Sequence, residues 1–566
     1  MSQATASIQL QIIWSRLIAA VEEQARSLIR AGFSTSTREA GDVSAGIFSP
    51  QGDMLAQAVT GTPGHINSMA RSVRHFLADY PLATLAEGDV LITNNPWKAT
   101  GHLSDITVVT PVFRQARVVA LFACTTHVVD IGGNGPSPES KQVYGEGLFI
   151  PIMKLAERGR VNESLLQIIR ANVREPVQVE GDVFALMACN DIGGRRLQKI
   201  MDEYRLEDID AVGNEILAHS KQAMMEAIAS LPRGSWRNAI RIDGYEKPVD
   251  LVATVTVDET GVRIDMTGTS GPSIYGINCP LCYTEAYAAF GVKSLIAPAL
   301  PNNAATLSCI TLTAPEDCIA NAAFPRPVVA RSLIGMFLPD LIFGCFQQAL
   351  PDRAPAESTG SLWNVRLAAA GSEHHPAFMV TSFHSGGAGA RPTLDGLSAT
   401  PFPSGVRNVP VEITEAMTSV VVWEKSLRQD SGGAGRFRGG LGQTMIIGNR
   451  YPVPLTLYAR FDRVDHPARG YAGGASGMTG RVALASGSVL KAKGMQPIPA
   501  DDRVVIDMPG GGGYGDATER DPQRVAEDVL AGYVSPAAAR QVYHVVLDAH
   551  HQVDAAATRL LRRTQG

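Results

Sequence analysis

The chain has 566 residues, more than a single hydrophobic core organises, so we expect about two to four domains. Its hydrophobic content of 45% and charged content of 19% are typical of a folded globular protein and exclude a disordered one. The net charge of −5 argues against a dedicated nucleic-acid binder. No apolar run approaches the ~18 residues of a membrane span, and no secretory signal opens the chain, so we expect a cytoplasmic protein without a membrane segment.

Helical and strand patterns alternate irregularly along the N-terminal part. Apolar residues at helical spacing from Ile13 to Leu28 predict an opening amphipathic helix. His65 follows in a Gly-Thr-Pro-Gly-His loop, just before a helix that we expect over 68–80. Helices dominate from about residue 162 to 230. Beyond that point the chain consists largely of short strands and glycine loops, until Asp and Pro open a last helical stretch at residue 521.

These elements predict a multidomain α+β fold with strand-rich central and C-terminal parts. The composition shifts near residue 235, where helices give way to alternating strands. We therefore expect four regions. They are an N-terminal α/β domain over 1–235, a mixed α+β domain over 236–400, a strand and glycine-loop region over 401–520, and a C-terminal helical tail over 521–566.

The most informative pattern is a His-x-x-Asp phrase that occurs twice, at 102–105 and at 127–130. Between the two copies, apolar β-branched runs flank a polar stretch, which predicts a β-hairpin with its turn near Ala116. Residues whose numbers sum to about 232 then face each other across the ladder, so Asp105 lies opposite His127. The open end of this hairpin brings His102, Asp105 and His127 within reach of one another.

Two imidazoles and one carboxylate suit a divalent transition metal, with coordination positions left for water or substrate. The pattern therefore predicts one metal bound by His102, Asp105 and His127; zinc and manganese both suit the set, and iron is not excluded. The alternative is accidental repetition in a chain with twelve histidines, which leaves a structural hairpin. Asp130 either orients His127 or caps the glycine turn that follows.

Two glycine loops repeat the phrase Ser-Gly-Gly-Ala-Gly, and a third runs over 509–515. Backbone N–H groups in such loops can hold anions, although tight turns and close strand packing are the alternative. No loop ends in Gly-Lys-Ser/Thr and none has the setting of a dinucleotide site, so the chain shows no ATP-binding signature. The candidates for lining a substrate or phosphate path are Ser385, Gly386, Gly387, Ser431, Gly432 and Gly433.

Long phrases follow one another in a characteristic order along the chain. They include Pro63-Gly-His-Ile-Asn-Ser-Met69, Gly101-His-Leu-Ser-Asp105, His127-Val-Val-Asp-Ile-Gly-Gly133, Asn172-Val-Arg-Glu-Pro176 and Pro509-Gly-Gly-Gly-Gly-Tyr-Gly-Asp516. In these phrases the chain resembles the hydantoinase B/oxoprolinase family over nearly its whole length. There are two departures, because many members have Gly-Gly-Thr-His before the first histidine and Asn-Asp-Pro where this chain has Asn94-Asn-Pro96. Both leave the candidate ligands in place, but they weaken an assignment of substrate by motif.

The resemblance implies one subunit of a two-part, ATP-dependent enzyme, whose partner is similar to hydantoinase A and binds ATP and magnesium. Members of the family open cyclic amides such as hydantoins, 5-oxoproline or lactams, and relatives carboxylate ketones. The ligands of metal-containing relatives correspond to His102, Asp105 and His127. His65 and Asp130 are candidate catalytic residues that would move protons.

We therefore expect the metal-containing subunit of an ATP-dependent cyclic amide hydrolase, which acts with a hydantoinase A-like ATPase subunit in a hetero-oligomer. A subunit of a ketone carboxylase, in which the metal stabilises an enolate, is the enzymatic alternative. A scaffold that positions the ATPase subunit is the non-enzymatic one.

Overall fold

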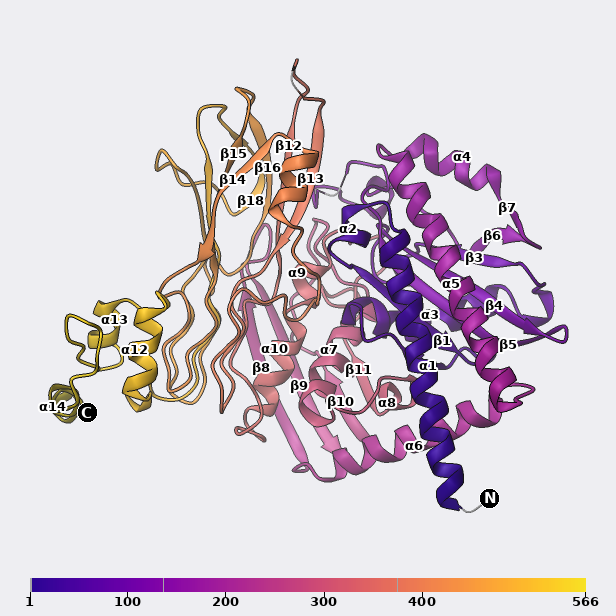
Figure 1. The fold of residues 1–566 in the computed structure, drawn as a ribbon, viewed down its shortest axis with the longest axis horizontal. Helices are drawn as coiled ribbons and strands as arrows, with labels where there is room; N and C mark the ends of the chain where they lie inside the picture. The colour runs from indigo at the N-terminus through magenta and orange to yellow at the C-terminus, as the bar shows by residue number, and fades with distance from the viewer. Residues whose placement is uncertain (1–2, 136, 374, 566) are drawn as a thin grey trace. The chain divides into compact units, whose positions relative to one another are not determined.

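The computed structural model describes residues 3–135, 137–373 and 375–565, which form helices and several separate sheets (Figure 1). The predicted multidomain α+β class is therefore confirmed. The chain divides into two units, whereas the four-region division drawn from the sequence stays a prediction. Unit 1 comprises Met1–Ser235, Ala253–Pro339 and Ser404–Arg407; unit 2 comprises Trp236–Val252, Asp340–Pro403 and Asn408–Gly566.

Unit 1 is built on a seven-stranded antiparallel sheet with the order β2-β1-β5-β4-β3-β6-β7. Helices α1 (Gln3–Ala31) and α5 (Pro176–Tyr204) run alongside each other over one face, and α3 (Pro63–Asp79) packs on the other (Figure 1). Burial on both faces explains why the central strands are continuously apolar. The strands are β1 (Val43–Phe48), β2 (Met54–Gln57), β3 (Val90–Thr93), β4 (Asp105–Arg114), β5 (Arg117–His127), β6 (Met153–Glu157) and β7 (Arg160–Val161).

The central hairpin of β4 and β5 has the register that the sequence predicts. Asp105 pairs with His127, and the pairing continues to the turn with one irregularity after Val112. Gln115 and Ala116 form the turn and have positive φ values of 50° and 62°. Two consecutive left-handed residues match a type I′ turn, whose twist suits a two-residue hairpin. The predicted hairpin is therefore confirmed.

A second sheet has the order β11-β10-β9-β8, in which β10 pairs parallel with β11 and antiparallel with β9. Helix α7 packs on α3, where Gly64 leaves room for the rings of Tyr283 and Tyr287. None of the helices in the described part of the chain has the length and hydropathy that a membrane span needs. The further elements are α2 (Thr35–Arg38), α4 (Glu163–Asn172), α6 (Asp210–Ala229), β8 (Gly234–Ile242), β9 (Val249–Asp258), β10 (Gly261–Asp265), α7 (Leu281–Ile296), α8 (Ala304–Ser308), β11 (Ile310–Thr313), α9 (Ser332–Gly335) and α10 (Leu338–Phe346), with 3₁₀ turns at Leu82–Thr84 and Val143–Gly145.

Two four-stranded sheets of unit 2 share one apolar core, and their orders are β13-β12-β16-β18 and β14-β15-β19-β17. The ring of Trp363 stacks on that of Phe461 in this core, with 4.4 Å between the centroids. Short helices at the C-terminus form a small core of their own. The elements are β12 (Trp363–Ala369), β13 (Phe378–His384), α11 (Val411–Met417), β14 (Val420–Leu427), β15 (Gln443–Asn449), β16 (Leu455–Arg460), β17 (Arg481–Leu484), β18 (Lys493–Ile498), β19 (Val504–Asp507), α12 (Pro522–Leu530), α13 (Pro536–Gln541) and α14 (Ala555–Gln565), with a 3₁₀ turn at Ala517–Glu519.

The glycine loops of unit 2 pack backbone against backbone. A Cβ atom on Gly387 would lie 1.8 Å from the carbonyl oxygen of Gly440, and one on Gly511 would lie 2.1 Å from that of Ala388. The loops are also hydrogen-bonded to each other, since Gly440 N–H donates to Ala388 and Gly511 N–H donates to Gly440 (2.8 and 3.0 Å). No side chain fits between loops at this separation, so the repeated glycines have a packing role.

We expect Gly387→Ala to lower the free energy of unfolding by about 3 kcal/mol or more, because backbone atoms cannot move away from the added methyl group. Gly271→Ala is the matched control, since among the described residues no atom beyond its chain neighbours lies within 4 Å of the position of its Cβ. We expect this control to stay within about 0.5 kcal/mol of the wild type. Thermal unfolding followed by circular dichroism measures both, and equal midpoints would contradict the packing role.

Candidate metal centre

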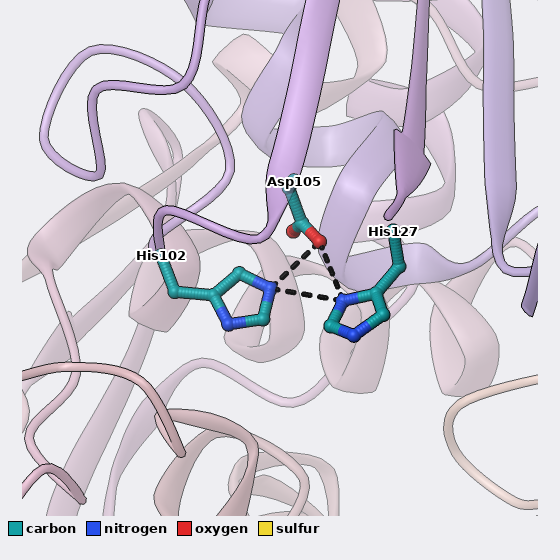
Figure 2. Close-up of side chains that lie close together, drawn as sticks. All are labelled: His102, Asp105 and His127. Carbon is teal, nitrogen blue, oxygen red and sulfur yellow. Dashed lines mark hydrogen bonds and ion pairs between the residues drawn. The ribbon is translucent and has the colours of Figure 1, made fainter. Parts of the chain in front are cut away.

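Three of the predicted site residues converge at the open end of the β4–β5 hairpin (Figure 2). Asp105 begins β4 and His127 ends β5, so the ladder places them opposite each other. His102 lies in the loop before β4, and its ring turns towards both (Figure 2). The Nε2 atom of His102 and the Nδ1 atom of His127 lie 2.6 and 3.0 Å from the same oxygen, Oδ1 of Asp105. The two nitrogens are 3.2 Å apart.

The three donor atoms form a triangle small enough to surround one cation. One ligand atom from each residue lies within 4.8 Å of the other two. Asp105 is fully buried and His102 is 4% exposed, whereas the side chain of His127 is 22% exposed. Of the three ligand side chains, that of His127 is therefore the most exposed.

The hydrogen bonding of His102 determines which of its nitrogens is free to bind a metal. Its Nδ1 lies 3.0 Å from the carbonyl oxygen of Val329, which only accepts, so Nδ1 carries the proton. Burial, together with the charge of Arg331, lowers the pKa of His102 to about 3, which favours the neutral ring. Nε2 then presents a lone pair to the carboxylate of Asp105. Two acceptors at this distance repel each other unless a cation lies between them, so the donor set fits a divalent metal.

The second oxygen of Asp105 is held by two further groups. The guanidinium of Arg331 donates to Oδ2, and Nε2 of His65 lies 2.9 Å from the same oxygen. Burial alone would raise the pKa of Asp105, but the charges of His65 and Arg331 outweigh it and hold that pKa well below its usual range. Asp105 is therefore an ionised carboxylate with one oxygen directed at the two histidines.

Arg331 is anchored on three sides in the interior of unit 1. Its Nε donates to the carbonyl of Thr100 at 2.7 Å, and its guanidinium lies 4.0 Å from the centre of the Tyr283 ring. Gly101 has a φ of +94°, and a Cβ atom there would lie 2.5 Å from Cδ of Arg331. The glycine before His102 therefore makes room for the arginine that holds Asp105.

His65 lies behind Asp105, in the first turn of α3. The helix begins at Pro63, so the expectation of a loop followed by a helix over 68–80 is wrong at this residue. The Nδ1 atom of His65 lies 3.5 Å from a carboxylate oxygen of Asp42. Burial lowers the pKa of His65, but the carboxylates of Asp105 and Asp42 outweigh it, so the net shift is upwards. His65 therefore joins the site through Asp105, and its catalytic role stays a prediction.

Asp130 is bound to a different partner. Its carboxylate accepts hydrogen bonds from the backbone N–H and from the guanidinium of Arg174 (2.5 and 2.8 Å). The same guanidinium donates to the carbonyl of Gly133, in the glycine turn that follows Asp130. The residue thus ties this turn to the segment before α5, and its catalytic role stays a prediction.

The candidate path residues of the glycine loops lie in unit 2. Gly387 N–H donates to the carbonyl of Pro509 and Gly433 N–H to that of Gly511 (3.2 and 2.8 Å). The hydroxyl of Ser431 donates to the carbonyl of Arg428. These donors are therefore engaged by partners within the protein. The path through Ser385, Gly386, Gly387, Ser431, Gly432 and Gly433 stays a prediction.

The chain matches known proteins over nearly its whole length. The model of the family Hydantoinase B/oxoprolinase matches residues 6–517. The chain belongs to this family. An uncharacterized protein of Methanocaldococcus jannaschii is 31% identical over 574 residues, which cover 98% of this chain and 99% of that protein. The B component of a putative D-/L-hydantoinase of a Pseudomonas species is 26% identical over 585 residues, which cover 98% of both.

Two solved structures also match nearly the full length of the chain. The ATP-dependent caprolactamase of Pseudomonas jessenii superposes with a TM-score of 0.88 at 26% identity and covers 98% of this chain and 99% of that one. Nucleotide-free acetone carboxylase superposes with a TM-score of 0.83 at 19% identity and covers 99% and 82%. The second likeness shows a shared fold only.

We expect the purified chain to contain about one divalent metal, because three buried or half-buried donors converge on one point. His102→Ala and His127→Ala each remove a ligand and should lose the metal. His219→Ala is the matched control, since the one partner of this exposed α6 histidine among the described residues is a carbonyl of its own helix. Elemental analysis by mass spectrometry measures all four proteins. A wild type without metal after gentle purification would reduce the convergence to a structural feature of the hairpin.

Proposed function

We propose that this chain is the metal-containing subunit of an ATP-dependent enzyme that opens cyclic amides by hydrolysis. The observation that carries the proposal is the convergence of His102 Nε2, Asp105 Oδ1 and His127 Nδ1 at the end of the hairpin. Membership of the hydantoinase B/oxoprolinase family and the likeness to a caprolactamase support a hydantoin, 5-oxoproline or lactam ring as substrate. The hydantoinase relative is named as one subunit of its enzyme, which supports the presence of a second subunit here.

The chemistry of an amide explains the need for ATP. The carbonyl is a weak electrophile because the nitrogen lone pair is delocalised into it. Transfer of the γ-phosphoryl group of ATP to the carbonyl oxygen makes the ring carbon a stronger electrophile, to which water adds. The tetrahedral adduct collapses with cleavage of the C–N bond, so that the ring nitrogen takes up a proton and leaves as an amine. The acyl phosphate that remains is hydrolysed by a second water to the carboxylate and inorganic phosphate. We propose that a hydantoinase A-like partner binds ATP and magnesium and that this chain provides the hydrolytic site.

The residues of this chain hold the cation and orient the ligand atoms. A divalent metal such as zinc or manganese, held by His102, Asp105 and His127, would act as a Lewis acid and would lower the pKa of a water at the site towards ~7. His102 directs Nε2 to the metal position because its Nδ1–H donates to Val329. Asp105 stays ionised because Arg331 and His65 bind its second oxygen. We propose that His65 positions Asp105, which it contacts. We propose that Asp130 positions His127, because it fixes the turn that follows β5.

The proposal predicts ATP-dependent ring opening by this chain together with its ATPase partner. A lactam, a hydantoin and 5-oxoproline are offered in turn, and the ring-opened acid and ADP are measured by chromatography. We expect the two products in equal amounts with the wild type, and neither with His127→Ala, because the ligand set is then incomplete. His219→Ala should match the wild type. Full activity of metal-free enzyme would overturn the proposal.

Ketone carboxylation is the competing outcome of the same assay. The preparation is offered acetone or acetophenone with labelled bicarbonate and ATP. Labelled product from a ketone, without opening of any cyclic amide, would place the chain with the carboxylases and overturn the hydrolase proposal.

A further inference from the structure

A buried glutamate lies behind the backbone segment that orients His102. Glu146 is 1% exposed, and its Oε1 accepts hydrogen bonds from the N–H groups of Val328 and Val329 at 2.7 and 2.9 Å. The carbonyl of Val329 in turn accepts the Nδ1–H bond of His102 at 3.0 Å. The carboxyl group and the imidazole are thus joined through two residues of backbone.

We propose that Glu146 is a positioning residue for His102. By holding the backbone of Val328 and Val329, it sets the direction of the Val329 carbonyl and hence the orientation of the imidazole whose Nε2 faces the metal position. The inference rests on the proposed function, because it assumes a metal at His102, Asp105 and His127.

The peptide that carries the Val329 carbonyl is held from its other side as well. Its N–H group, that of Ala330, donates to the carbonyl of Gly276 at 2.6 Å. A Cβ atom on Gly276 would lie 2.9 Å from Oε1 of Glu146, so the glycine permits this close approach. The carbonyl that binds His102 therefore sits in a rigid setting, to which Glu146 contributes its carboxyl group.

The environment of Glu146 does not fit a purely stabilising role. Burial raises the pKa of its carboxyl group to about 8, against the two N–H donors, which lower it. Its Oε2 is buried and has no hydrogen-bond partner among the described residues. An incompletely satisfied buried carboxyl group costs stability. Its presence next to the His102 contact therefore points to the orientation of that ligand.

The same backbone segment also reaches a second ligand. Arg331 follows Val329 by two residues and donates to Oδ2 of Asp105. A shift of the segment would therefore disturb His102 and Asp105 together. Partners of metal ligands typically contribute about 10–100-fold to metal affinity, and we expect an effect of that size at Glu146.

Three variants separate the positioning role from general stability. Glu146→Leu removes the acceptor of the two N–H groups, whereas Glu146→Gln keeps an acceptor oxygen of the same reach. The matched control is Asp89→Leu, because Asp89 is a fully buried carboxylate that accepts from the N–H groups of Ala86 and Arg158 (both 2.9 Å) and from Lys154, outside the site.

The experiment measures cobalt(II) binding to the full chain by competition with a chromophoric chelator, together with the visible spectrum of the bound ion and the Tm. We expect Glu146→Leu to bind cobalt about 10–100-fold more weakly and with altered absorption bands. Glu146→Gln should bind within about threefold of the wild type, and Asp89→Leu should keep wild-type affinity and spectrum despite a lower Tm. If Glu146→Leu is insoluble, Glu146→Asp replaces it, with several-fold weaker binding expected because its oxygen is withdrawn by one methylene.

Two results would overturn the positioning role while leaving the metal site intact. One is wild-type affinity in Glu146→Leu, or in Glu146→Asp if that variant replaces it; the other is an equal loss of affinity in Asp89→Leu. A loss of affinity in Glu146→Gln equal to that in Glu146→Leu would also overturn it, since the acceptor would then not be the deciding feature. Failure of the wild type to bind cobalt would sink the proposed metal function itself, and with it this inference.

Discussion

Asp105 carries a negative charge in the interior of unit 1, and the surrounding elements are arranged around that charge. An isolated carboxylate in such a position is very costly, whereas one whose two oxygens are both paired is tolerated. Arg331 and His65 pair with one oxygen, and the other faces His102 and His127, where we propose that a metal ion completes the pairing. Because the partners come from a loop, a strand, a helix and a distant segment, the charge can be satisfied only when all four have folded together.

The seven-stranded sheet supplies the rigidity that this arrangement needs. Alternate residues of β5 enter two separate cores, with Phe122 on the side of α1 and α5 and Leu121 on the side of α3. A slip by one residue would exchange the two faces, so the cores lock the register that sets Asp105 opposite His127. Precision at the site is thus a product of packing some distance away from it.

The sequence predicts those features that depend on neighbours along the chain. The face of α1 from Ile13 to Leu28 is buried as its spacing indicates, and the hairpin has the expected register because alternation and turn chemistry are local. The Thr-Pro pair before His65 could have indicated the early start of α3, since proline is favoured in the first turn of a helix. Arg331 and Glu146 were not predictable. Arg331 contacts Asp105 across 226 positions of sequence, and Glu146 contacts Val328 across 182. No rule based on the spacing of residues predicts contacts over such separations.

The β4–β5 hairpin has a consequence for how this chain can change in length. A residue inserted or deleted within either strand would turn Asp105 or His127 to the opposite face of the sheet unless a bulge absorbed it, as one does after Val112, because side chains alternate along a strand. At the exposed turn of Gln115 and Ala116 the chain is free of that restriction, since both residues lie at the closed end of the ladder, about 30 Å from the open end at the strand rise. Changes in length at the turn therefore leave the pairing of Asp105 with His127 in place, and a peptide tag or fluorescent label inserted there would leave the ligand geometry undisturbed.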